Sequence, residues 1–147
     1  MIRRDDGFVG GIEVLPFGVL IFVFGTLLIA NAWAVVDARL AVDAAAREAT
    51  RAYVEAGDPA RGDAAARQAA VAAVRGVGRD PDLLGLSGNH RRYVRCAVAE
   101  FSATYRVPAL SIPVIGGFGH GFTVRGSHRE IIDPLAAGVG EESDCGY

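Results

Sequence analysis

The chain has 147 residues, 51% of them hydrophobic, and its 15 basic and 17 acidic residues leave a net charge of −2. This balance excludes the broad basic field that binds nucleic acid, so we expect no nucleic-acid partner. The length leaves room for one small folded domain beside a membrane segment.

The first predicted element is an uninterrupted apolar run, Val14–Val36, which contains no charged residue. As a helix with a rise of ~1.5 Å per residue, the run would span about 35 Å, enough to cross a hydrocarbon core of ~30 Å. Its polar members Thr26 and Asn31 can each form a local hydrogen bond on a helix. Trp33, near the outer end, is typical of a membrane-interface anchor. A cleaved secretory signal is the alternative, because small-x-small patterns occur in residues 30–34, although the run exceeds the ~7–15 apolar residues of such signals.

We predict that the same helix continues beyond the run to Ala56, because the sequence from Asp37 consists almost entirely of strong helix formers. Residues 37–56 would form a helical stem outside the membrane. Leu40, Ala44 and Glu48, together with Ala41, Ala45 and Ala52, suggest a narrow stripe of small residues along it.

A second, alanine-rich helix is expected from Pro59 to Val77. Gly57 suits the position after a helix end, Asp58 an N-cap, and Pro59 the first position of the next helix. The glycines and prolines between Gly76 and Asn89 then predict a loop.

Strand patterns follow. Residues 99–107 alternate with period two, which predicts a half-buried strand, and a change of phase before Ala99 indicates a bulge or a strand break. A second strand, antiparallel to the first, is expected over Phe122–Ile132. Between them, residues 109–112 are expected to be extended and Gly116–Gly121 to form a turn. Phe118 and Phe122 beside this turn either form an exposed aromatic patch or pack into the core.

The predicted fold class is therefore α+β: a long N-terminal membrane-spanning helix that continues into a stem, a second alanine-rich helix, and a small antiparallel β-sheet. Cys96 and Cys145 have neither zinc-site nor CxxC spacing. In an oxidising compartment they could form one disulfide that pins the C-terminal tail; the alternative is two independent thiols. The tail, residues 138–147, is acidic and glycine-rich and is expected to be flexible.

Motifs for catalysis are weak. A metal site can be drawn from His120, His128 and Glu130, but no HExxH or comparable spacing supports it, and His90 stands in a predicted loop. The glycine-rich turn Gly116–Gly121 is followed by neither a lysine nor a predicted helix, which argues against a phosphate loop. We therefore predict a non-catalytic protein with no cofactor and no metal.

Glu13 stands at the mouth of the apolar run, and Gly7 is followed by the aromatic Phe8. The plain interpretation places the Glu13 carboxylate among the lipid headgroups. Alternatively, Glu13 enters the apolar phase and pairs with an α-amino group at Phe8 of a neighbouring chain, exposed by cleavage after Gly7.

This order of residues resembles the class III signal of type IV pilins and pseudopilins. The chain as a whole resembles the TadE-like family of tight-adherence (Flp-type) pilus assembly proteins, in an actinobacterial form. The resemblance rests on the segment Ile12-Glu13-Val14-Leu15-Pro16, on the alanine-rich helix that follows the run, and on a late strand pair closing on Glu130–Pro134. In the family the glutamate is the fifth residue after the cut, whereas Glu13 is the sixth when counted from Phe8.

The resemblance implies a minor pilin or pseudopilin that acts in assembly of a Flp-type pilus or related secretion filament. A prepilin peptidase would remove the leader, residues 1–7. Residues 8–36 would cross the plasma membrane once with the N-terminus inside, and residues 57–137 would form a small extracytoplasmic α+β domain. Its partners would be membrane lipid, other pilin subunits and the assembly machinery, in the membrane and in a filament at the cell surface. A single-pass membrane-anchored extracytoplasmic binding domain, unrelated to pili, is the alternative function.

Overall fold

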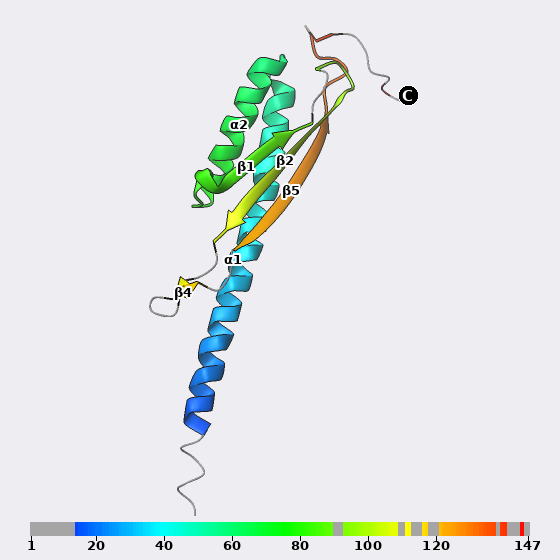
Figure 1. Ribbon diagram of the computed structural model, residues 1–147. Helices are drawn as coiled ribbons and strands as arrows, with labels where there is room; N and C mark the ends of the chain where they lie inside the picture. Colours follow the sequence, from blue (N-terminus) through cyan, green and yellow to red (C-terminus); the bar gives the residue numbers. More distant parts are fainter. Residues whose placement is uncertain are drawn as a thin grey trace, which may run out of the picture. The chain divides into compact units, whose positions relative to one another are not determined.

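The computed structural model describes residues 14–89, 93–108, 111–112, 116–117, 121–137, 139–140 and 145. Two helices and a 3₁₀ turn precede the strands (Figure 1): α1 (Val14–Glu55), α2 (Pro59–Gly76), η1 (Pro81–Leu83), β1 (Leu84–Gly88), β2 (Val98–Val107), β3 (Ser111–Ile112), β4 (Gly116–Gly117) and β5 (Phe122–Ile131). The chain divides into two compact units, Met1–Ala34 and Val35–Tyr147, and α1 runs through both. The fold is α+β, as predicted.

The prediction of one continuous helix from the apolar run into the stem is confirmed, because α1 extends from Val14 to Glu55. The helix ends where Gly57 adopts a positive φ of 80°, a conformation that glycine reaches without a steric penalty. The Tyr93 hydroxyl donates to the Val54 carbonyl and accepts from the Gly57 amide, both at 2.8 Å. These bonds satisfy backbone groups that the end of a helix leaves without intrahelical partners.

The stem of α1, Asp37–Glu55, buries a face made mainly of alanine. Its fully buried residues are Ala38, Ala41, Val42, Ala45, Ala46, Ala49, Thr50 and Tyr53. This spacing of three and four residues is that of one helix face. Ala41 and Ala45 of the predicted stripe are buried, whereas Leu40 is 64% exposed and Glu48 is also exposed, so that part of the prediction is wrong. Because the buried face follows Ala38, Ala41 and Ala45, Leu40 lies to one side of it.

Small side chains let the stem approach the sheet closely. A Cβ atom added at Gly126 of β5 would lie 3.1 Å from the Val42 carbonyl carbon and from the Asp43 nitrogen, which leaves no room for a side chain. The Thr50 hydroxyl donates to the Ala46 carbonyl at 2.7 Å and lies 3.2 Å from the His128 carbonyl of β5. From Val42 to Thr50 the stem therefore packs on the sheet through close backbone contacts, and the larger Tyr53 packs on Phe101 near the end of the helix.

Helix α2 begins as predicted. Asp58 is its N-cap, and its side chain accepts from the Arg61 amide at 2.9 Å. This backbone hydrogen bond, followed by one from the Arg61 side chain, lowers the pKa of the Asp58 carboxyl. Gly62 lies against Tyr53, where an added Cβ would come within 2.7 Å of the ring. The buried face of α2 continues with Ala66, Ala70 and Val74.

Strands β1, β2 and β5 form an antiparallel sheet in the order β1-β2-β5. The two predicted strands are confirmed: β2 and β5 pair from Val98↔Ile131 to Val107↔Phe122. Alternate residues of β2 from Ala99 to Val107 are buried, and the Phe101 ring packs 5.3 Å from that of Tyr53. Polar residues hold the opposite face, where Arg129 bonds Glu100 at 3.0 Å across the strands.

Two further features concern the segments before β2. The predicted strand break is confirmed, because β2 starts at Val98 and Cys96 has a positive φ of 63°. The loop predicted between Gly76 and Asn89 is wrong over Leu84–Gly88, which forms β1 and pairs with β2. This segment has little intrinsic strand preference, and a Cβ added at Gly85 would lie 2.5 Å from the Thr104 hydroxyl oxygen. Pairing with β2, rather than local sequence, makes it a strand.

Candidate membrane and assembly surface

The apolar half of α1 carries large hydrophobic side chains that have no folded partner in the described structure. None of the residues from Val14 to Val36 is buried, and the most apolar stretch has a mean hydropathy of 2.4. By length and composition this helix can cross a membrane, although an N-terminal signal sequence has the same properties. Trp33, predicted to be an interface anchor, is 73% exposed.

The polar residues of this segment bond within the helix, as predicted. The Thr26 hydroxyl donates to the Phe22 carbonyl and the Asn31 amide donates to the Leu27 carbonyl, both at 2.8 Å. Each bond returns a polar group to the backbone one turn earlier. The cost of placing either side chain in a hydrocarbon medium is thereby reduced.

The residues predicted to direct processing and subunit pairing, Gly7, Phe8 and Glu13, lie outside the described residues. The described part of α1 begins at Val14, directly after Glu13. Cleavage after Gly7 and pairing of Glu13 with an α-amino group therefore stay predictions.

An ion pair joins the stem to the segment after α2. Arg79 donates to the same Asp37 carboxylate oxygen through Nε at 2.9 Å and through Nη2 at 2.7 Å. The Arg79 guanidinium also lies 5.3 Å from the centre of the Tyr105 ring on β2, within cation–π range. Its side chain is only 15% exposed. Asp37 is the first charged residue after the apolar run, so the contact fixes the domain to the stem next to the end of that run.

The opposite end of the sheet holds the two cysteines. The structure pairs Cys96 with Cys145, with a Cα–Cα distance of 5.1 Å. Val139 is buried, and Gly140 forms a parallel bridge with Val94. These described residues of the C-terminal tail are therefore attached to the segment that precedes β2.

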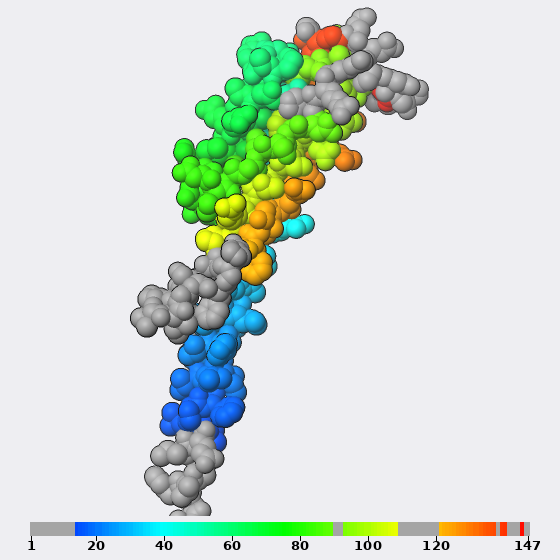
Figure 2. All heavy atoms as spheres, in the orientation of Figure 1, coloured from blue at the N-terminus to red at the C-terminus, as the bar shows by residue number. Residues whose placement is uncertain are grey.

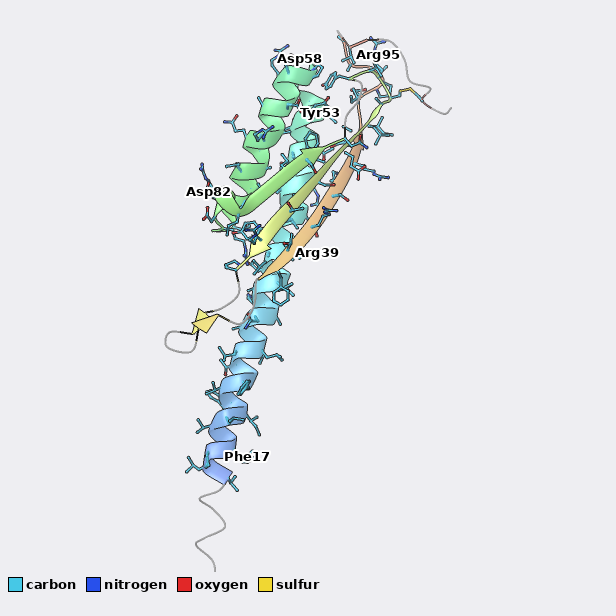
Figure 3. The ribbon with its side chains drawn as sticks, in the orientation of Figure 1. Phe17, Arg39, Tyr53, Asp58, Asp82 and Arg95 are labelled. Atoms are coloured by element: carbon cyan, nitrogen blue, oxygen red, sulfur yellow. A yellow bond between two sulfur atoms is a disulfide. The ribbon has the colours of Figure 1, made fainter. Side chains whose placement is uncertain are left out.

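A ring cluster at this end closes the core between α1, α2 and the sheet. Tyr53 is fully buried, and its ring packs 5.2 Å from that of Tyr93 at an interplanar angle of 67°. Burial is the main cause that raises the pKa of Tyr53 to about 12, and the nearby Asp63 carboxylate adds to it. Figure 3 shows Tyr53, Asp58 and Arg95 toward this end and Arg39 and Asp82 toward the other.

The polar face of the sheet bears a shallow hollow. In Figure 2 the atoms of β1, β2 and β5 lie over the stem of α1 and present this face to the viewer. A hollow of about 330 Å³ is lined by Asp82, Leu83, Leu84, Gly85, Thr104, Arg106 and Thr123. It combines one carboxylate, one guanidinium and two hydroxyls, and it is open on the surface, which favours contact with a polar group over enclosure of a substrate.

The metal site drawn from sequence is not assembled in the described residues. His128 is half-buried on β5 and Glu130 lies two positions on, whereas His90 and His120 lie outside the described residues. No group of three or more His, Cys, Asp or Glu side chains suited to a metal occurs within the part of the chain that the structure describes.

No protein-family model, curated protein or solved structure matches the chain. Sequence reasoning did not anticipate the contact of Asp37 with Arg79, or the hollow on the sheet. The tertiary fold brings those residues together, and their only sequence signal is Asp37 as the first charge after the apolar run.

Proposed function

We propose that the protein is a minor pilin or pseudopilin that acts without catalysis in assembly of a Flp-type pilus or a related secretion filament. A single-pass helix with its N-terminus inside would hold the protein in the plasma membrane before assembly, with the domain outside. A prepilin peptidase would remove residues 1–7. The same apolar helix would then pack against the helices of other subunits.

One observation carries this proposal: helix α1 is continuous from an unburied apolar half into a stem that forms part of the core of the α+β domain. A domain anchored by a flexible linker would keep its fold independent of its anchor. Here Ala38, Ala41 and Val42 are buried within two turns of the end of the apolar run. Such continuity suits a subunit in which one helix serves both as the anchor and as part of the domain core.

The first test is the mass of the mature N-terminus. The full chain is expressed with a cognate prepilin peptidase and, separately, with a catalytically inactive peptidase. We expect loss of Met1–Gly7 only with the active enzyme. A start beyond Ala34 would identify a cleaved secretory signal, and an unprocessed N-terminus with both enzymes would favour a membrane-anchored binding domain unrelated to pili.

The second test replaces the glutamate at the mouth of the apolar run. Glu13→Ala removes the carboxylate that would pair with a neighbouring α-amino group, so filament assembly should fall sharply while membrane insertion persists. Glu55→Ala is the matched control, because its carboxylate forms a surface pair with Arg51 at 2.9 Å in the last turns of α1. Equal assembly by the two variants would contradict the proposal.

A further inference from the structure

Two arginines and two threonines form a small square on the polar face of the sheet. The strand register pairs Arg106 of β2 with Thr123 of β5, and Thr104 of β2 with Arg125 of β5. These positions alternate with buried residues along both strands, so all four side chains lie on the face turned away from the core. The two arginines therefore occupy one diagonal of the square, a spacing of ~7–8 Å between Cα atoms.

The two arginines of the square form no ion pair with a carboxylate among the described residues. The ion pairs in that part of the chain engage other arginines: Arg51, Arg61, Arg79 and Arg129. Arg129 lies on the same sheet face and bonds Glu100, the residue opposite it, at 3.0 Å. Arg106 and Arg125 instead lie opposite threonines, and both are exposed. Two neighbouring cations repel one another, and a bound anion would offset that repulsion.

The square coincides with the hollow on this face. Thr104, Arg106 and Thr123 line its volume of about 330 Å³, and Arg125 lies directly opposite Thr104. Small-molecule sites commonly measure about 300–1,000 Å³. A planar guanidinium presents pairs of N–H donors that match the oxygens of a phosphate group, and a threonine hydroxyl adds a further donor. A phosphate ester has three free oxygens and about two negative charges, which two guanidiniums can share.

The rest of the hollow is acidic and apolar. Asp82 lies in η1, directly before β1, and lines the same hollow as Arg106 (Figure 3). A carboxylate repels a bare phosphate but accepts hydrogen bonds from hydroxyl groups. Leu83 and Leu84, which also line the hollow, are half-buried and offer apolar surface for carbon atoms.

We propose that this site binds the phosphate ester of a small polyol. The phosphate would lie between Arg106 and Arg125, with the Thr123 hydroxyl as a further donor, and a free hydroxyl of the polyol would donate to Asp82. All of these residues belong to the folded domain, so the inference goes beyond the proposed function and does not depend on assembly into a filament.

The test follows binding of glycerol phosphate to the full, isotope-labelled chain in nonionic detergent by two-dimensional NMR. Inorganic phosphate and glycerol are titrated separately, because each represents one half of the proposed ligand. We expect saturable shifts of the Thr104, Arg106 and Thr123 amide signals with glycerol phosphate, binding of inorganic phosphate about tenfold weaker, and no binding of glycerol alone. Absence of saturable shifts with glycerol phosphate, or shifts confined to other parts of the domain, would overturn the proposal.

Arginine variants test the phosphate end of the site. Arg106→Gln and Arg125→Gln should each weaken binding of glycerol phosphate about tenfold, because each removes charge-assisted hydrogen bonds. Arg129→Gln is the matched control, since it removes a cation of the same face that Glu100 already engages, and it should change the affinity less than about twofold. The amide spectrum of each variant shows whether the domain is folded. Equal losses in all three variants would indicate a general effect of charge and would overturn the site.

Asp82→Ala tests the polyol end. Removing the carboxylate takes away both a hydrogen-bond acceptor and a negative charge. We therefore expect weaker binding of glycerol phosphate and tighter binding of inorganic phosphate, two changes of opposite sign. Tighter binding of both ligands would show that Asp82 only repels anions, and would overturn the assignment of a polyol hydroxyl to it.

Discussion

The two halves of helix α1 share one backbone conformation and differ in everything that surrounds it. From Val14 to Val36 the side chains are large and apolar, and none is buried. From Asp37 to Glu55 most of the buried side chains are alanine, and they pack against the sheet and α2. Hydrophobic character alone therefore does not decide which part of a helix enters a protein core.

Side-chain size explains the difference. A stem made of alanine can approach the sheet to the distance seen at Gly126, whereas a helix bearing phenylalanine and leucine on all sides presents no single face to a small domain. A helix that is apolar all round needs lipid or other helices around it. Matched changes in the two halves of α1, or in their contacts, test this explanation.

The largest expected effect comes from filling the closest contact of the stem. Gly126→Val would place side-chain atoms against the backbone at Val42 and Asp43, and we expect the domain to lose about 3 kcal/mol of unfolding free energy. The matched change Gly25→Val, in the apolar half where an added Cβ meets nothing within 4 Å, should leave domain stability unchanged. Urea unfolding of the full chain in detergent, followed by circular dichroism, measures both. Equal midpoints for the two variants would show that the stem does not depend on this contact.

A smaller effect is expected from pH, through the buried Tyr53. Its pKa is raised from 10.0 to about 12 in the folded state, so folding favours the protonated phenol. Stability should be complete below pH 10 and fall by roughly 2 to 3 kcal/mol as pH rises toward 12, at about 1.4 kcal/mol per pKa unit. Unfolding free energies of the wild type and Tyr53→Phe, measured from pH 9 to 12, test this. The variant should lose less stability over this range; parallel curves would assign the loss to other groups.

The smallest effect compares two threonines of α1. Thr50 is fully buried, and its hydroxyl bonds the Ala46 carbonyl near His128 of β5, so Thr50→Val should cost about 1 kcal/mol. The Thr26 hydroxyl likewise donates to a carbonyl one turn earlier, that of Phe22, but Thr26 is exposed. Thr26→Val should therefore leave the unfolding free energy of the domain unchanged. Thermal unfolding of both variants in detergent decides the comparison. A loss of similar size in both would mean that the contact with the sheet adds nothing to the bond within the helix.

Much of this fold could be predicted from local patterns. A few neighbouring residues are enough to predict the helix from Asp37 onward, its stop at Gly57 with the next cap at Asp58, and the strand β2 with its period-two alternation. The structure confirms all of them. Strand β1 could not be predicted in this way, because Gly85 and Gly88 mark a loop by local preference and become a strand only through hydrogen bonds with β2.

For the candidate site, local sequence is enough to predict the apolar run, its length, and the local hydrogen bonds of Thr26 and Asn31, because helix periodicity places each donor beside a carbonyl one turn earlier. The exposure of Leu40 beside the buried Ala41 and Val42 depends on tertiary packing and could not be predicted locally. Tertiary packing also brings Arg79 to Asp37 and places the ends of β2 and β5 beside the start of the stem. These contacts join residues far apart in sequence, and their geometry follows from how closely small side chains let the stem approach the sheet.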